Sequence, residues 1–291
     1  MTRKLKVDFF KVVLPDDSPH SFEHILHAVN NSPKDDTRNV TRNTCPFRLQ
    51  NAWQTEDCWK GEMIRIRMDQ LPMKAKLSGE VSPIDLEKDE GIGEETAFLY
   101  HVPTRVLTIQ RNRYGVSAGV FAWYFGEKGS VASIELEPVL QKDGLQRLAN
   151  IREVRKLSLN IAGAENMTVF QGLGKGVESM IALIDQFKSP NLTLTLSMGK
   201  KRGSLEWVKD FAQSFVKSNQ QGESSIHKFE ISGKTEDGEK SVLDLIEYRM
   251  VEEIEVELKS GRTLSSSARE YAVQEAFSSR KQELVEMFSR Q

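Results

Sequence analysis

Three residues near the C-terminal end of the chain have the types and order found in metal-dependent nucleases. Asp244 is followed by Glu257 and Lys259, in the loose pattern acid, acid-x-lysine. In such enzymes two carboxylates hold Mg²⁺ or Mn²⁺, which polarises the phosphodiester, while the lysine stabilises charge or orients water. The spacing is degenerate, because Glu253, Glu255 and Glu257 alternate with apolar residues as in any half-exposed strand. A nuclease is therefore kept as the alternative function, and a solvated strand face as the main interpretation.

Two other patterns fall short of ligand-binding motifs. His20, His24 and His27 have a helical spacing that suits zinc, but neither HExxH nor paired CxxC sequences accompany them. The glycine-rich stretch 172–179 lacks the Gly-Lys-Ser/Thr ending of a phosphate loop and the third glycine of a dinucleotide fingerprint. We expect no metal site and no cofactor, with Mg²⁺ or Mn²⁺ only under the nuclease alternative. The glycines then mark a helix entrance, where Lys175 can still contact a phosphate.

Short basic clusters suit phosphate groups better than catalysis. Lys200, Lys201 and Arg202 precede Ser204, which can cap a following helix, so that N–H groups and cationic side chains act together on an anion. The further candidates are Lys175, the pair Arg111 and Arg113, and the pair Arg65 and Arg67, which share one face of a predicted strand. No zinc-finger, RNP or clear helix-turn-helix pattern is present, so these contacts would be electrostatic and weakly sequence-selective. An ordinary solvated surface is the alternative for each cluster alone.

The charge of the chain is unevenly distributed, although the net charge is only −2. Residues 85–95 hold six acids against one base, residues 230–257 hold ten acids against three bases, and residues 96–229 hold seventeen bases against eleven acids. A basic middle between acidic segments can bind a polyanion while the chain stays near neutral. Chance partition of surface charge is one alternative, and an interaction subunit whose acidic 85–95 segment docks a basic partner is another.

Composition and length indicate a folded protein of a reducing compartment. The chain has 291 residues, of which 38% are hydrophobic, enough for a sizeable core and two subdomains. Its apolar runs fall short of the ~20 residues that span a bilayer, and its N-terminal residues lack the apolar core of a signal peptide. Cys45 and Cys58 are its only cysteines. We expect a cytoplasmic protein without membrane insertion.

Strand and helix patterns alternate along the chain and must position these side chains. In the first half, alternation and apolar spacing predict strands at 5–14, 47–53, 63–68, 96–102, 105–110 and 133–140, and helices at 18–30 and 117–125. In the second half they predict strands at 155–162, 192–198, 226–232, 243–250 and 254–258, and helices at 175–187, 204–216 and from the serines at 265–267 to about 290. Asp237-Gly238 predicts a tight hairpin turn.

These elements predict an α+β fold with mixed, largely antiparallel sheets, helices on one face and a long C-terminal helix. Two subdomains are expected, residues 1–141 and residues 142–291, which meet near Lys142–Asn150. The second has the order β-α-β-α-β before its terminal helix.

With these segments in order, the chain resembles the RexA-type phage-exclusion proteins, a prophage-encoded group that protects the host cell against other phages. The resemblance spans about two-thirds of the chain. It rests on Asp89–Gly93, Phe98–Tyr100, Ile134–Leu140, Lys234–Glu239 and, in the C-terminal helix, Glu283, Met287, Phe288 and Arg290. Residues 30–59 have no counterpart. The resemblance transfers no DNA-contacting residue, so the basic clusters are assigned from the residues alone.

The resemblance implies a homodimer that binds DNA with little sequence preference. It also implies that this protein acts in abortive infection, a form of defence against phages. It also implies a second defence protein as partner, often a membrane effector. Together with the basic clusters, it predicts a non-enzymatic, largely sequence-nonspecific DNA-binding protein of bacterial antiphage defence, with Lys200, Lys201 and Arg202 as the principal phosphate contacts.

Overall fold

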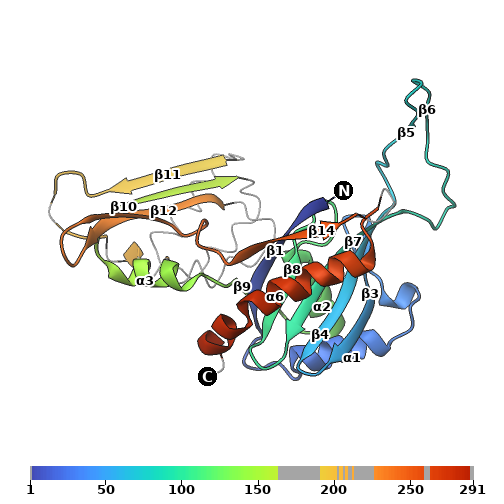
Figure 1. Cartoon of the computed structure of the whole chain (residues 1–291), viewed down its shortest axis with the longest axis horizontal. Helices are drawn as coiled ribbons and strands as arrows, with labels where there is room; N and C mark the ends of the chain where they lie inside the picture. Colours follow the sequence, from blue (N-terminus) through green and yellow to red (C-terminus); the bar gives the residue numbers. More distant parts are fainter. Residues whose placement is uncertain are drawn as a thin grey trace. The chain divides into compact units, whose positions relative to one another are not determined.

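The chain folds as an α+β protein with antiparallel sheets and a long C-terminal helix, as its periodicities predicted (Figure 1). The computed structural model describes residues 2–162, 191–201, 203–205, 207–208, 212, 226–258 and 263–288. Among these residues, no helix combines the length and the apolar character that a membrane span requires.

The chain divides into two compact units that are interleaved in the sequence. Unit 1 comprises residues 1–8, 12–134 and 252–291, and unit 2 comprises residues 9–11 and 135–251. The sequence suggested a single boundary between residues 141 and 142. The structure instead groups the C-terminal strand and helix with the N-terminal residues, because both pack on the N-terminal sheet.

The larger sheet has eight strands. It contains β1 (Thr2–Val13), β2 (Val40–Arg42), β3 (Cys45–Thr55), β4 (Cys58–Arg67), β7 (Ile92–His101), β8 (Val106–Gln110) and β14 (Val251–Glu257), in the order β14-β1-β8-β7-β4-β3-β2, and β9 (Glu135–Pro138) pairs with β1 beside this path. The strands β7 and β8 form the hairpin that the sequence predicted around Pro103. The predicted strand at 254–258 becomes the edge strand β14, next to β1.

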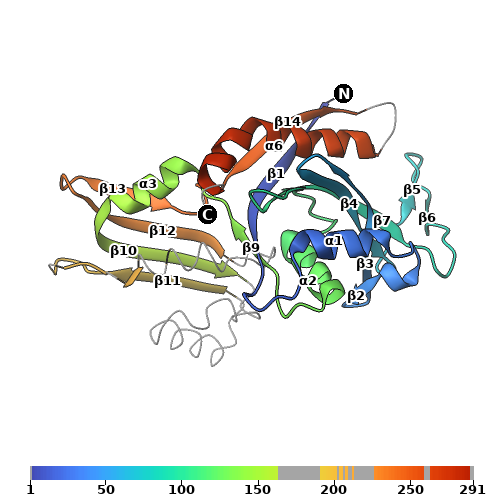
Figure 2. The ribbon, with the colours of Figure 1, turned by 90° about the horizontal axis from the view of Figure 1, so that it is seen from below.

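Helices lie on both faces of this sheet (Figures 1 and 2), and they bury different side chains against it. On one face, α1 (Phe22–Asn31) and α2 (Ala118–Gly129) bury an aromatic cluster in which neighbouring ring centroids are 4.7–6.0 Å apart; its members are Phe22, Phe98, Tyr100, Phe121 and Phe125. On the other face lies α6 (Ser266–Phe288), where Phe277 packs against His101 of β7. Tyr100 and His101 are consecutive, so strand alternation sends their side chains to opposite faces.

Serine caps begin the three long helices of unit 1. The Oγ atoms of Ser21, Ser117 and Ser265 accept the backbone N–H groups of residues 24, 120 and 268. These caps satisfy donors that have no partner inside the helix, so they help to fix where each helix begins.

Between β4 and β7 the chain makes a long excursion, the hairpin arm (residues 68–91), which extends away from the sheet (Figure 1). It contains the short strands β5 (Lys74–Ala75) and β6 (Val81–Ser82), joined by only two residue pairs. Its large apolar side chains Met73, Leu77 and Val81 are all exposed.

Unit 2 is built around a four-stranded antiparallel sheet. Its strands are β10 (Ile151–Ala162), β11 (Asn191–Ser197), β12 (Ile226–Thr235) and β13 (Lys240–Asp244), in the order β11-β10-β12-β13, and α3 (Lys142–Asn150) precedes β10. Gly238, at a φ of 80°, supplies the positive φ of the predicted turn between β12 and β13. The predicted helix at 175–187 and most of that at 204–216 lie outside the described residues.

Candidate nucleic-acid interface

The loop after β11 presents two of the three predicted principal phosphate contacts. Lys200 and Lys201 are exposed, and neither has an ion pair with a described residue. The guanidinium of Arg155 on β10 donates to the backbone carbonyls of Gly199 at 3.1 Å, Lys201 at 2.6 Å and Gly203 at 2.7 Å. This single side chain therefore fixes the backbone from which both lysines extend. We call residues 199–201 and 203, with Arg155, the clamped loop.

The clamped loop is also held to β10 by its next residues. Ser204, predicted as a helix cap, accepts the N–H of Val154 at 2.9 Å, and Leu205 donates its N–H to the carbonyl of Val154 at the same distance. Two predicted contacts, Arg202 and Lys175, lie outside the described residues.

Lys156 adds a cation to the same end of the small sheet. It lies on β10 opposite Ser197 of β11, which immediately precedes the clamped loop. Its Nζ is 4.0 Å from the carboxylate of Glu230, at the limit of an ion pair. Because both groups are partly exposed, water screens most of that attraction and leaves Lys156 able to face an anion.

The predicted pair Arg111 and Arg113 is divided by the structure. Arg111 forms a two-point ion pair with Asp8, with Nε 2.8 Å from Oδ2, and the hydrogen bond to Asp8 raises the pKa of Arg111 above its usual value. Its charge is thus largely compensated within the protein. Arg113 is exposed, with its guanidinium 6.0 Å from the ring centroid of Tyr114.

Arg65 and Arg67 share one face of β4, as predicted, but both are partly buried. The Nε of Arg65 donates to the Sγ of Cys45 at 3.3 Å, and its Nη1 donates to the carbonyl of Tyr114 at 3.4 Å. The Nε of Arg67 is buried and has no hydrogen-bond partner among the described residues. Arg65 therefore joins β3, β4 and the segment before α2.

Sequence reasoning missed Arg155, Arg42 and Trp123. Arg155 is one of two arginines in β10, and its acceptors lie more than forty residues further along the chain. The guanidinium of Arg42, on β2, lies 5.6 Å from the ring centroid of Trp123, on α2. Neither contact has a local sequence signal, because each depends on how segments far apart in the sequence pack together.

The residues of the nuclease alternative lie in different units. Asp244 ends β13 in unit 2, where its Oδ1 accepts the N–H groups of Phe229 at 3.3 Å and Ile246 at 3.0 Å. Glu257 is exposed at the end of β14 in unit 1, and Lys259 lies outside the described residues. Asp244 therefore has a structural role, that of fixing the turn after β13.

The three histidines whose spacing suits zinc contact other side chains. His20 precedes α1, and His24 and His27 lie on it. His20 and His24 stack with ring centroids 4.4 Å apart, whereas His27 hydrogen-bonds to Asn31 and packs edge-on against Trp59. Within the described part of the chain, no three His, Cys, Asp or Glu side chains gather as a metal site would require.

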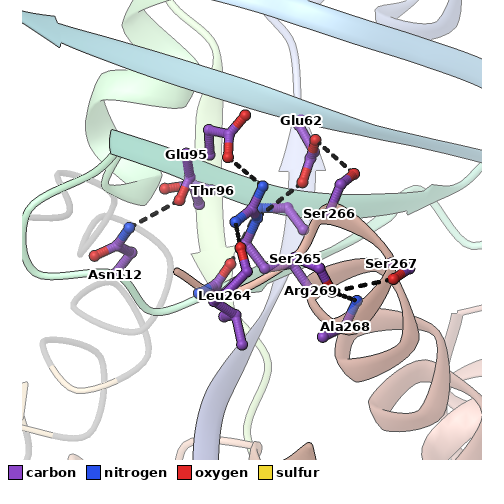
Figure 3. A network of polar contacts seen from close by, with 12 residues as sticks. Glu62, Glu95, Thr96, Asn112, Leu264, Ser265, Ser266, Ser267, Ala268 and Arg269 are labelled. Atoms are coloured by element: carbon purple, nitrogen blue, oxygen red, sulfur yellow. Dashed lines mark hydrogen bonds and ion pairs between the residues drawn. The ribbon is translucent and has the colours of Figure 1, made fainter. Parts of the chain in front are cut away.

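A buried ionic network joins α6 to the large sheet (Figure 3). Arg269 is 6% exposed, and its Nε donates to Glu62 at 2.8 Å while its Nη2 bonds to Glu95. Ser266 donates to the other oxygen of Glu62 at 2.8 Å, and Arg269 Nη1 bonds to the carbonyl of Leu264. Since each buried charge faces an opposite charge, the network fixes the N-terminal end of α6.

Comparison with known proteins places the chain in a family without assigning it an activity. No curated protein matches the sequence. The model of one family matches residues 1–283, nearly the whole chain. The chain thus belongs to the family of unknown function DUF6731.

Proposed function

We propose that this protein binds DNA through the phosphate backbone, with little sequence preference and without catalysis. The clamped loop carries the proposal, because its backbone is held by three hydrogen bonds from Arg155 while Lys200 and Lys201 stay exposed. A fixed loop loses little conformational entropy when its cations meet phosphates, whereas free lysines on a mobile loop lose more.

Electrostatics and local geometry support phosphate contact more than base reading. Lysine is a compact charge that meets a phosphate from many directions, while base recognition needs planar, bidentate groups in a groove. Binding of this kind releases condensed counterions, so affinity falls steeply as salt rises.

The first test is the salt dependence of duplex binding by the full-length chain. We expect Lys200→Ala/Lys201→Ala to reduce the log–log slope of affinity against salt by about 2, one for each lost phosphate contact. The matched control is Lys34→Ala/Lys88→Ala, which removes two exposed lysines from loops of unit 1. Binding would be measured by fluorescence anisotropy on one duplex over a salt series.

This titration and two further assays distinguish the three candidate functions. Salt-insensitive binding, no binding to any duplex, or an equal slope change in the control would refute the proposal. Mg²⁺- or Mn²⁺-dependent cleavage that disappears in Asp244→Ala and Glu257→Ala would instead favour the nuclease. Charge reversal in 85–95 that abolishes capture of a partner, with DNA affinity intact, would favour an interaction subunit.

The biological setting of this proposal is antiphage defence in the bacterial cytoplasm. It rests on the resemblance to phage-exclusion proteins, which also suggests a homodimer acting with a second protein, a membrane effector. Plaque counts on cells that express the chain would test the setting. Protection is expected to fall with Lys200→Ala/Lys201→Ala and to persist with Lys34→Ala/Lys88→Ala. Sedimentation of the purified chain would test the dimer.

A further inference from the structure

We infer that unit 1 carries a second nucleic-acid site, a guanidinium–aromatic surface that stacks on unpaired bases. It consists of Arg42, Arg65, Arg113, Tyr114 and Trp123. The ligand class is single-stranded nucleic acid. This site is separate from the clamped loop, which lies in unit 2, so either can fail without the other.

The first half of the surface lies at the β2–β3 edge of the large sheet. Arg42 is exposed, and its guanidinium lies over the partly exposed ring of Trp123. Trp123 packs edge-on against Phe47, with centroids 6.1 Å apart, so the indole is fixed from its inner side. Asn43 and Thr44, with φ of 50° and 65°, form the tight turn that sets Arg42 opposite Cys45.

Arg65 connects this edge to the second half of the surface. It lies opposite Phe47 in the β3–β4 ladder, and its Nη1 holds the carbonyl of Tyr114 at 3.4 Å. The ring of Tyr114 is 57% exposed and has the guanidinium of Arg113 beside it. The ring of Tyr114 is thus exposed to solvent while its backbone carbonyl is held by Arg65. The guanidinium of Arg113 lies beside the ring.

The charge of the surface favours a polyanion. Arg42, Arg65 and Arg113 have no ion pair with any described residue, while Arg111, two positions before Arg113, is neutralised by Asp8. Two acids lie nearby. Glu94 is opposite Arg65 in the β4–β7 ladder, and Asp69 accepts the hydroxyl of Thr44. The three guanidinium groups nevertheless have no carboxylate within ion-pair distance among the described residues, so they remain available to a polyanion.

The aromatic rings select unpaired bases over a duplex or an acidic peptide. A ring stacks on the face of a base, and in a duplex those faces are already covered by neighbouring base pairs. An acidic peptide would need the guanidinium groups but not the rings. Single-stranded binders combine a cationic track with aromatic platforms, and stacking tolerates any base because every base has a π-face.

The test compares two exposed tyrosines on opposite faces of one sheet. Tyr114 is 57% exposed beside β4, and Tyr271, on α6, is 53% exposed. We expect Tyr114→Ala to weaken binding of a single strand of about 20 nucleotides by about 5- to 150-fold. Tyr114→Phe should keep wild-type affinity, because the ring remains, and Tyr271→Ala should have no effect. Both tyrosines are exposed, so the variants should fold.

Binding of four nucleic acids to the full-length chain is compared: oligo-dT, oligo-rU, a duplex and an abasic strand. The abasic strand keeps its phosphates but has no bases, so it should bind wild type and Tyr114→Ala equally. Preference between oligo-dT and oligo-rU identifies the natural strand as DNA or RNA. Arg113→Ala should weaken single-strand binding and flatten its salt dependence, compared with Arg3→Ala, which removes an exposed arginine of β1.

Three results would overturn the inference. The first is single-strand affinity that is unchanged in Tyr114→Ala. The second is an equal loss in Tyr271→Ala, and the third is an equal loss on the abasic strand. A loss of duplex binding in Lys200→Ala/Lys201→Ala with intact single-strand binding would concern the clamped loop alone.

Discussion

Two arginines of α6 each meet two carboxylates, but in different surroundings. The side chain of Arg269 is 7% exposed and contacts Glu62 and Glu95, whereas that of Arg280 is 31% exposed and contacts Glu252 and Glu283. A buried charge that loses its partner cannot recover hydration, whereas a partly exposed one can.

We therefore expect Arg269→Leu to lower the free energy of unfolding by about 3–5 kcal/mol, because Glu62, 3% exposed, is left without a countercharge. Arg280→Leu should cost less than about 1 kcal/mol. Urea unfolding measures both values. Adding Glu62→Leu to Arg269→Leu should restore part of the stability, and a double variant no more stable than the single one would show that the buried charge is not the cause.

A buried histidine on the same face makes stability depend on pH. His101 is 3% exposed, and its ring packs on Phe277. The Nδ1 atom of His101 lies 2.7 Å from the Oγ1 atom of Thr104. Burial lowers the pKa of His101, and the charge of Lys281 lowers this pKa further. Below the ordinary histidine pKa of about 6.5, the unfolded chain therefore binds a proton before the folded chain does.

Stability should accordingly fall as the pH drops from about 7.5 to about 5.5, with this one group contributing at most ~1.4 kcal/mol per pH unit. His101→Phe should reduce that dependence, because it removes the buried imidazole. Urea midpoints across this range provide the measurement. Equal pH dependence in wild type and His101→Phe would contradict the assignment.

At the scale of elements, the hairpin arm is attached to the fold through very few interactions. Lys76 and Glu80 form an ion pair that is exposed at both ends, and Leu77 between them is fully exposed. A two-stranded hairpin of this size is marginal in water by itself. Moreover, Arg67 and Ile92 are direct partners in the β4–β7 ladder, so the arm is the loop of a long hairpin.

Replacing residues 68–91 with Asn-Gly should therefore leave the large sheet intact, because this pair forms the tight turn that closes two-residue hairpins. We expect a urea midpoint equal to or above that of the wild type, since a shorter loop costs less entropy. In the wild type, trypsin should cut first after Lys74 or Lys76. An insoluble or unfolded deletion variant would show that the arm supports the fold.

At the scale of the whole molecule, local patterns predicted the elements and long-range contacts decided their neighbours. The hairpins at Pro103 and Asp237-Gly238 could be predicted, because turn residues and strand alternation lie side by side in the sequence. The strand that pairs with β14 could not be predicted. Its alternating glutamates and apolar residues indicate a half-exposed strand but do not distinguish β1 from β13.

In the candidate sites, too, local features could be predicted from the sequence and long-range contacts could not. Exposure of Lys200 and Lys201 was predictable from a charged run beside Gly203, but the clamp of Arg155 was not. Likewise, nothing near Arg111 in the sequence indicates Asp8 as its partner, because strand pairing alone brings them together.

The interleaving of the two units imposes an order on folding during synthesis. On the ribosome, all of 135–251 must be made before β14 and α6 emerge, which takes on the order of ten seconds. Throughout that interval the part of β1 that pairs with β14 lacks this partner, and Glu62 and His101 face water instead of a helix. The large sheet is thus completed only after translation has passed the small one, and chaperones have the whole of that interval in which to bind its uncovered face.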